Sequence, residues 1–182
     1  MKIAVHLAEG FEEIEAICII DVLRRAGFDV ITVSVTGDLM VTGSHDIPVI
    51  ADGHFENIDY NSIDMIVLPG GMPGAKNLNS HEGLKNQILQ FNESGKPLGA
   101  ICAAPLVFGK LGILKGKNAT CYPGNEEYLE GAEITGSPTE VAGNIITGKG
   151  AGVAIDFALK IVEQLKGEAE AKELAEKMVV KQ

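Results

Sequence analysis

Few side chains of this 182-residue sequence are chemically reactive, because it holds three cysteines and four histidines. The cysteines are odd in number, widely spaced and without a C-x-x-C motif, so neither a disulfide framework nor a zinc ribbon is expected. We accordingly predict no metal and no cofactor. Reduced thiols of this kind are typical of a cytoplasmic protein. The reactive residues are Cys18, Cys102, Cys121, His6, His45, His54 and His81.

Cys102 stands where an apolar strand is expected to give way to a helix. The segment PLGAICAAP, at residues 97–105, surrounds it with small residues. A sharp strand–nucleophile–helix turn needs such neighbours, because its backbone is crowded and the nucleophile must project outward. A thiol beside a helix N-terminus would have a lowered pKa, because it feels the positive end of the helix dipole. The pattern also fits an unreactive cysteine buried in a tight joint.

A glycine-rich segment, LPGGMPG at residues 68–74, follows another apolar strand. Glycines at this place allow backbone N–H groups to face a crevice. Together with the N–H of Ala103, those of Gly70 and Gly71 could form an oxyanion hole. The alternative is an ordinary glycine–proline loop.

Three glutamates in the segment EEIE, residues 12–15, open the first expected helix. Acidic residues stabilise a helix N-terminus, and that role alone would account for all three. Glu15 differs because helical spacing places it on the same face as Ile19 and Val22, toward the sheet. A desolvated carboxylic acid has a raised pKa and can donate a hydrogen bond to a thiolate.

Continuous apolar runs alternate with helical patterns, which predicts a mostly parallel sheet covered by helices on both faces. Residues 39–51 are expected to form a hairpin or an irregular excursion. Ligands of such sheets bind beyond the carboxyl ends of the strands, so we expect the site in the loops that follow them. The expected strands are residues 2–7, 29–35, 63–68, 97–101, 119–122 and 145–147, and the expected helices are residues 11–26, 80–93 with Ser80 as its cap, 103–111, 152–165 and 168–177.

The composition, with 46% apolar and 22% charged residues, is that of an ordinary globular chain, which we expect to form a single domain over residues 1–182. The net charge of −10 argues against a nucleic-acid partner, because phosphate contacts need clustered lysines and arginines. No membrane partner is expected either, because no apolar run reaches ~18 residues and the first residues lack a secretory signal pattern.

The segment GNIITGKG, at residues 143–150, nearly matches a phosphate-binding loop. Its last position should be Ser or Thr to hold magnesium, but it is Gly150. The two isoleucines also favour a strand where that motif needs a loop. A strand followed by a tight turn into a helix is therefore the better interpretation.

Six motifs together make the sequence similar to the ThiJ/PfpI superfamily, in the branch of the Parkinson-associated protein deglycase. The resemblance covers nearly the whole chain. It implies a flavodoxin-like three-layer α/β/α sandwich of the class I glutamine amidotransferase-like type, usually a homodimer. The motifs are LAEGFEEIEA at residues 7–16, DVLRRAG at 21–27, VLPGG at 67–71, GAKNL at 74–78, AICAAP at 100–105 and FALKIVE at 157–163.

The resemblance also implies roles for single residues. Cys102 corresponds to the nucleophile, which ionises easily and oxidises to a sulfinate, and Glu15 to the protonated glutamate that hydrogen-bonds it. Gly71 and Ala103 correspond to the backbone oxyanion donors. Tyr122 stands where the deglycase branch often has a histidine, and a phenol is a weak base at neutral pH.

The superfamily includes glutathione-independent glyoxalases, proposed deglycases, proteases and redox-regulated chaperones. Protease-like members carry a histidine directly after the elbow cysteine, where this chain has Ala103. Related amidotransferases need a late histidine, and this chain has none after His81. The missing histidines argue against a protease and an amidotransferase, and leave Cys102 and Glu15 as the pair of residues that could carry out catalysis.

We therefore expect a cofactor-free cysteine enzyme that acts on small reactive carbonyls, such as methylglyoxal, in carbonyl and oxidative stress. One alternative is a redox sensor or chaperone that acts through oxidation of Cys102, and another is a protease-like activity, which the missing histidine disfavours. Cys18 is expected to lie in the core. Cys121 is either a core residue or a second oxidisable thiol near Cys102.

Overall fold

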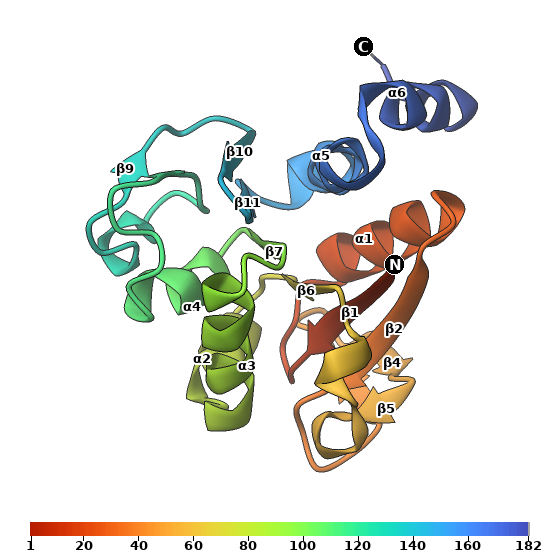
Figure 1. Cartoon of the computed structure of the whole chain (residues 1–182). Helices are drawn as coiled ribbons and strands as arrows, with labels where there is room; N and C mark the ends of the chain where they lie inside the picture. Colours follow the sequence, from red (N-terminus) through yellow and green to blue (C-terminus); the bar gives the residue numbers. More distant parts are fainter. Residues whose placement is uncertain (182) are drawn as a thin grey trace.

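A seven-stranded sheet forms the middle layer of the molecule, whose computed structural model describes residues 1–181 (Figure 1). The strand order is β10-β11-β7-β6-β1-β2-β5, and only the pair β10–β11 is antiparallel. The predicted mostly parallel sheet is thereby confirmed. Its strands are β1 (Lys2–Leu7), β2 (Asp29–Ser34), β5 (Gly53–His54), β6 (Met65–Leu68), β7 (Leu98–Ile101), β10 (Thr139–Ala142) and β11 (Ile145–Gly148).

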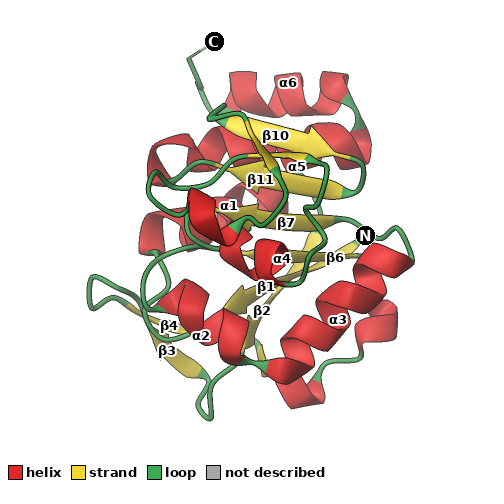
Figure 2. Cartoon of the chain, turned by 90° about the vertical axis from the view of Figure 1, so that its left-hand side faces the viewer, coloured by secondary structure: helices red, strands yellow, loops and turns green. Residues whose placement is uncertain are grey.

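Helices cover both faces of this sheet, as Figures 1 and 2 show. Helices α1 and α5 pack against each other on one face, with α6 outside α5, while α2, α3 and α4 lie on the other face. The result is the expected flavodoxin-like α/β/α sandwich. The helices are α1 (Glu13–Arg25), α2 (Gly74–Ser80), α3 (Glu82–Glu93), α4 (Pro105–Lys110), α5 (Ala154–Lys166) and α6 (Glu168–Lys177).

The core lies between the sheet and its two helical layers. Every residue of β6, β7 and β11 is buried, which is why these strands appear as unbroken apolar runs in the sequence. Phe108 of α4 and Phe157 of α5 fill the two sides of the sheet with no exposed surface. This packing holds the central strands, and thus the loops at their carboxyl ends, in fixed positions.

Several details differ from the sequence-based expectation. Residues 39–51 do form a hairpin, β3 (Met40–Thr42) with β4 (Pro48–Ile50). Helix α2, however, was not expected, because its glycine and asparagine residues favour turns. Ser80 is the last residue of α2 and not the cap of α3, since the His81 side chain accepts the N–H of Leu84 at 3.0 Å.

The other differences concern the edges of the sheet. The edge strand β10 was missed because its residues are only half buried and so form no apolar run. A two-stranded sheet pairs β8 (Asn118–Ala119) with β9 (Glu133–Ile134), so β8 is shorter than the strand expected at residues 119–122. Gly143 turns the chain between β10 and β11. The segment that resembles a phosphate-binding loop, residues 143–150, therefore contains a strand, as predicted.

Within residues 1–181, no helix combines the length and apolar character needed to cross a bilayer.

Candidate active site

Cys102 follows the last residue of β7 and has a left-handed backbone conformation, with φ of 64°. Such a φ is uncommon for a residue other than glycine and is found where the fold imposes it, often at functional sites. The N–H of Cys102 donates to the carbonyl of Gly148 at 2.8 Å, and α4 starts three residues later at Pro105. The predicted strand–cysteine–helix elbow is therefore present in the structure.

Gly70 lies between the elbow and helix α1 and allows them to approach closely. A Cβ atom at this position would lie 2.6 Å from Cys102 Cβ and 2.7 Å from Glu15 Oε2, so only glycine fits between the two side chains. The N–H of Gly70 donates to Glu15 Oε2 at 2.8 Å. One glycine thus separates the cysteine from the glutamate and also fixes the orientation of the carboxyl group.

Glu15 is fully buried and points from α1 toward the carboxyl ends of the central strands. Its Oε1 atom has no well-aligned hydrogen-bond partner within residues 1–181, while the Cys102 thiol lies near enough for the two groups to shift each other's pKa. Burial raises the pKa of Glu15 to about 7, despite the opposing effect of the Cys102 thiol and the Gly70 N–H. A neutral carboxylic acid is therefore available near physiological pH, as expected.

The pKa of Cys102 is raised to about 12, which contradicts the lowered pKa expected from the sequence. The main cause is burial, followed by the negative charge of Glu15 and the hydrogen bond with it. When Glu15 is protonated its charge disappears, and the carboxylic acid can donate a proton toward the sulfur. The cysteine and the glutamate therefore titrate as one coupled pair.

Two backbone N–H groups oppose this rise, namely those of Gly71 and Ala103, which hydrogen-bond the Cys102 sulfur and lower its pKa. Gly71 has φ of 92°, and a Cβ there would lie 2.4 Å from the backbone nitrogen of Glu12. The close approach of the two loops thus requires glycine at this position. Both predicted oxyanion donors stand beside the sulfur, where they could also bind an oxygen attached to an adjoining carbon.

A cavity of about 370 Å³ opens above Cys102. Tyr122 stands on its wall with about half of its surface exposed, and its N–H donates to the Cys102 carbonyl at 2.8 Å. The cavity is open to solvent on one side, and its volume is enough for a small molecule. It is lined by Glu12, Ser44, Gly71, Met72, Cys102, Ala103, Tyr122, Pro123, Gly124 and Asn125.

Six of these lining residues were not singled out in the sequence as part of a site, and three of the six, Glu12, Ser44 and Asn125, have polar side chains that can interact with a ligand. Glu12 is the N-cap of α1, where its carboxylate accepts the N–H of Glu15 at 2.6 Å. Ser44 belongs to the β3–β4 hairpin and reaches the cavity because Phe11 forms a bridge with Gly43. No local sequence pattern indicates such contacts between distant segments.

Next to the cavity, the buried carboxylate of Glu13 accepts the backbone N–H of His45 at 2.6 Å and lies 2.9 Å from its Nδ1. These contacts lower the pKa of Glu13 to about 2 against the opposing effect of burial, and they raise the pKa of His45. Possible metal ligands of Glu12, Glu13 and His45 lie within 4.8 Å of one another. The Glu13 oxygens, however, are already occupied by hydrogen bonds, including one from the Ser44 hydroxyl.

The two remaining cysteines lie in different surroundings. Cys121 is 4% exposed and precedes Tyr122, so it is near the elbow in the fold, and burial raises its pKa to about 11. Cys18, in the middle of α1, packs against the core without being fully buried. Burial raises its pKa to about 11 as well. Their surroundings disfavour the thiolate form of both residues.

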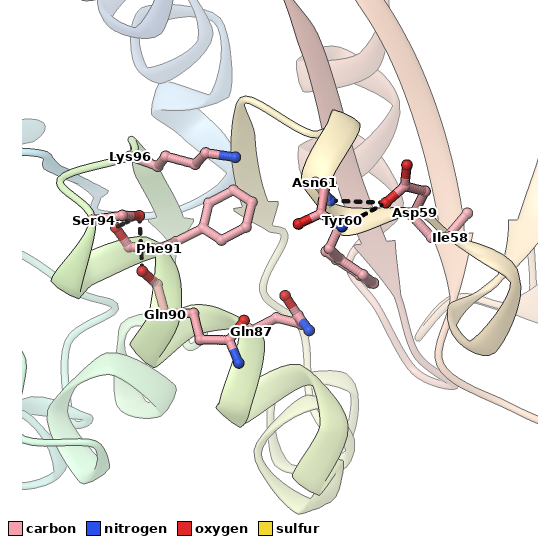
Figure 3. Close-up of a pocket in the computed structure, with 9 residues that line it drawn as sticks. All are labelled: Ile58, Asp59, Tyr60, Asn61, Gln87, Gln90, Phe91, Ser94 and Lys96. Carbon is pink, nitrogen blue, oxygen red and sulfur yellow. Dashed lines mark hydrogen bonds between the residues drawn. The ribbon is translucent and has the colours of Figure 1, made fainter.

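A larger cavity, of about 570 Å³, lies elsewhere, between α3 and the 3-10 turn η2 (Tyr60–Ser62) (Figure 3). Lys96 at its rim precedes β7, whereas Cys102 follows β7. This cavity therefore lies at the amino ends of the strands, opposite the carboxyl ends where Cys102 lies. The Lys96 ammonium donates to the carbonyl of Ile63 at 2.7 Å. No thiol or histidine lines this cavity, and it carries no part of the chemistry above.

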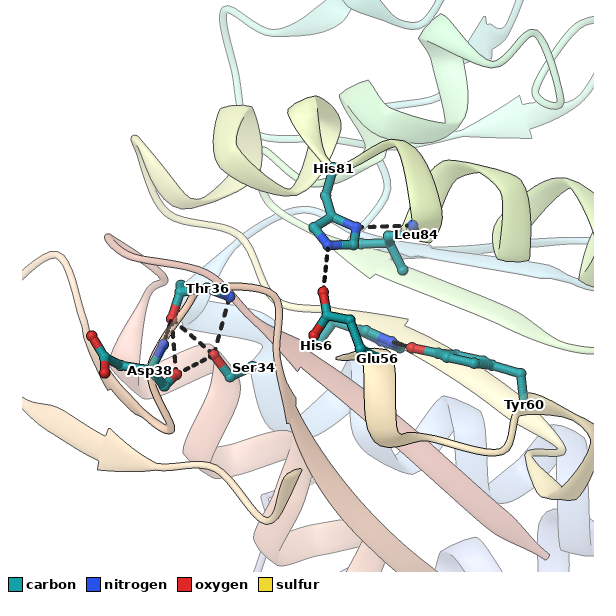
Figure 4. A network of polar contacts seen from close by, with 8 residues as sticks. All are labelled: His6, Ser34, Thr36, Asp38, Glu56, Tyr60, His81 and Leu84. Atoms are coloured by element: carbon teal, nitrogen blue, oxygen red, sulfur yellow. Dashed lines mark hydrogen bonds and ion pairs between the residues drawn. The ribbon is translucent and has the colours of Figure 1, made fainter. Parts of the chain in front are cut away.

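A second polar cluster surrounds His6 in β1, which is fully buried (Figure 4). Its Nε2 lies 2.7 Å from the Tyr60 hydroxyl, and its Nδ1 has no partner within the described part of the chain. Burial lowers the pKa of His6 to about 3, and the nearby His81 contributes in the same direction. His6 is therefore neutral at physiological pH and belongs to the core.

Comparison with known proteins gives a consistent result. The model of the DJ-1/PfpI family matches residues 1–164. Protein DJ-1 homolog B of Arabidopsis thaliana is 41% identical over 180 residues, covering 98% of this chain and 41% of the plant protein. The chain thus spans less than half the length of this relative. A protein of Pyrococcus abyssi named as a deglycase is 28% identical over 168 residues, covering 91% of this chain and all of that protein.

The fold agrees with solved structures of the same group. Oxidized DJ-1 of Toxoplasma gondii superposes with a TM-score of 0.94 at 35% sequence identity. The superposition covers 98% of this chain and 97% of the Toxoplasma chain. The chain therefore shares its overall fold with this DJ-1 structure.

Proposed function

The chain belongs to the DJ-1/PfpI family, and we propose that it is a cysteine-dependent enzyme acting on small reactive carbonyls, with methylglyoxal as the test substrate. The observation that carries this proposal is the pairing of Cys102 with the buried, protonatable carboxyl of Glu15 under a small open cavity. The deglycase name of the archaeal relative supports the same substrate class. The physiological setting would be carbonyl and oxidative stress in the cytoplasm.

The proposed reaction begins when the Cys102 sulfur attacks the aldehyde carbon of methylglyoxal. A C–S bond forms, and the carbonyl π electrons move to oxygen. The N–H groups of Gly71 and Ala103 would bind this oxyanion until it takes up a proton and becomes a hemithioacetal. The coupled pair supplies the thiolate, because Glu15 accepts the thiol proton and keeps it within reach.

Glu15 would also carry the proton in the next step. After giving the thiol proton to the oxyanion, Glu15 removes the proton on the former aldehyde carbon and returns it to the neighbouring carbon. The hydroxyl proton of the hemithioacetal moves to the former ketone oxygen, which completes the conversion into a thioester of lactate. Water then cleaves the C–S bond, so lactate leaves and the thiol is restored. The sum is methylglyoxal plus water giving lactic acid, and neither glutathione nor a redox partner is consumed.

The test is to mix the purified protein with methylglyoxal in the absence of glutathione and to measure lactate. Wild type is expected to form lactate, whereas Cys102→Ala is expected to form none above the uncatalysed rate. Cys121→Ala serves as the matched cysteine control and is expected to retain turnover. Equal lactate formation by Cys102→Ala and wild type would exclude the mechanism.

The second candidate is a redox sensor or chaperone that responds through oxidation of Cys102. The oxidized state of the Toxoplasma relative favours it, as does the position of Tyr122 where a histidine base is expected. Mild peroxide should then add two oxygens to Cys102, as measured by intact mass and peptide mapping. Selective oxidation together with negligible lactate formation would favour the sensor over the enzyme.

We extend the proposal to a homodimer formed through the first half of α1 and the β3–β4 hairpin. These two segments are joined, because Glu13 accepts N–H groups from the hairpin. They expose large apolar side chains of the kind that a second copy would cover: Ile14, Ile17, Met40, Ile47 and Ile50. Sedimentation equilibrium is expected to give a dimer for wild type and a shift toward monomer for Ile14→Glu.

A further inference from the structure

The wall of the cavity above Cys102 carries a negative charge and no positive one. Of the residues that line it, only Glu12 carries a full charge at neutral pH, and neither lysine nor arginine contributes to its wall. Glu12 is anchored there, because its carboxylate accepts the N–H of Glu15 and its own N–H donates to the carbonyl of Gly70 at 2.9 Å. Its charge reaches the reactive pair, since it is one of the causes that raise the pKa of Glu15.

The groups around Glu12 do not reverse this charge. Glu13 is a carboxylate beside it, and the His45 ring that pairs with Glu13 projects into solvent. Asp46 follows His45 in the hairpin, and across the cavity Glu126 holds the loop by accepting the N–H of Gly124 at 2.7 Å. Glu13, Asp46 and Glu126 therefore add negative charge near the wall that Glu12 already makes negative.

We propose that Glu12 is a specificity-determining residue, which makes the Cys102 cavity select uncharged electrophiles and repel anionic ones. For the carbonyl reaction this favours neutral dicarbonyls over aldehydes that bear a carboxylate or a phosphate. The product of the proposed reaction, lactate, is itself an anion, so the same carboxylate also promotes its release. This consequence for substrates rests on the proposed function, whereas the charge selection at the thiol does not.

The decisive experiment alkylates Cys102 with two reagents of similar size and different charge, iodoacetamide and iodoacetate. The quantity measured is the ratio of their second-order rate constants at Cys102, determined by peptide mass spectrometry at one pH and low ionic strength. Both reagents attack the same thiolate, so a change in the thiol pKa cancels in the ratio. A neutral small thiol, N-acetylcysteine methyl ester, provides the reference ratio.

In wild type we expect iodoacetamide to be favoured about fivefold or more over the reference ratio, as one nearby charge in a partly solvated site would produce. Glu12→Gln keeps an oxygen that can cap α1 and should bring the ratio back to within about twofold of the reference. Glu168→Gln, which removes an exposed acid from the first turn of α6, is the matched control and should leave the ratio unchanged. Adding salt should weaken the wild-type preference.

An unchanged ratio in folded Glu12→Gln would overturn the proposal. If that variant does not fold, Asn125→Lys decides, because it places a positive charge on the same wall, with Asn125→Gln as its neutral counterpart. Asn125→Lys should then favour iodoacetate relative to Asn125→Gln, and equal ratios for the two would overturn the proposal. Because alkylation needs no turnover, a wild type that makes no lactate yet shows the charge preference would refute the proposed function alone.

Discussion

The N–H of Gly70 donates to Oε2 of Glu15 at 2.8 Å, while Oε1 of the same carboxyl lacks a well-aligned partner within residues 1–181. A buried carboxylate would normally satisfy both oxygens. The arrangement suits a carboxylic acid that holds one oxygen fixed and uses the other to exchange a proton with Cys102 or with a bound carbonyl.

The first prediction concerns the pH dependence of Cys102 reactivity. The pKa of Glu15 is raised to about 7, so the pair loses its first proton near that pH. Above this pH the pair holds a single proton, shared between sulfur and carboxyl, and the thiolate form becomes accessible. Alkylation of Cys102 by iodoacetamide should therefore rise through pH 7, well below the pKa of the thiol alone. In Glu15→Gln the step near pH 7 should disappear, and a step that persists would contradict the coupled pair.

The second prediction is that Glu15, although needed for activity, lowers the free energy of unfolding as the pH rises above 4.5. Its pKa is 4.5 in the unfolded chain and about 7 in the folded protein, so the unfolded state releases its proton first as the pH rises. The free energy of unfolding should therefore decrease between pH 4.5 and 7 relative to Glu15→Gln. The free energy of unfolding of Glu15→Gln, relative to that of wild type, should be about 1–3 kcal/mol higher at pH 8 than at pH 4.5. Urea unfolding at both pH values measures this difference.

The same variant should lose most of its turnover. Removal of a general acid–base group typically lowers a rate by about 10²–10⁴-fold, and we expect kcat/KM for methylglyoxal to fall within that range. Glu168→Gln, which removes an exposed acid from the first turn of α6, is the control and is expected to retain turnover. A Glu15→Gln variant with wild-type kcat/KM would remove Glu15 from the mechanism.

The third prediction concerns the space between the elbow and α1. In Gly70→Ala the added methyl would overlap Cys102 Cβ and Glu15 Oε2, so the two side chains must move apart. Overpacking of this kind typically costs about 1–3 kcal/mol, and the step in alkylation near pH 7 should be lost as well. Gly37→Ala is the matched control, because no atom lies within 4 Å of its added carbon. Thermal unfolding and alkylation rates compare the two variants.

The fourth prediction concerns acid stability and His6. Its pKa is about 3 in the folded protein and 6.5 in the unfolded chain, so below pH 6.5 the unfolded chain takes up a proton that the folded protein refuses. This group alone should reduce the free energy of unfolding by about 2 kcal/mol between pH 6.5 and 5. His6→Gln should be less stable than wild type at pH 7 but should lose less stability on acidification. His54→Gln, on the edge strand β5, is the control and should keep the wild-type slope.

Much of the fold could be read from the sequence because it depends on local patterns. The strands β1, β6 and β7 are buried on both faces, so they appear as continuous apolar runs, and α1 follows ordinary helical spacing. The edge strand β10 and the short α2 escaped prediction, because one is half-exposed and the other is rich in glycine and asparagine. Their positions depend on neighbouring elements more than on their own residues.

For the site, the sequence by itself determined which residues could act: a cysteine on a strand–helix turn among small residues, glycines after a strand, and a glutamate on the inner face of a helix. Only the tertiary structure decided how they behave. Burial raises the pKa of both Cys102 and Glu15, and the charge of Glu15 raises that of Cys102 further, which the helix dipole alone would not suggest. Glu12 and Ser44 likewise reach the cavity through contacts between distant segments. The physical reason is that desolvation and Coulomb interactions depend on distances in space, which residue types and their spacing along the chain do not specify.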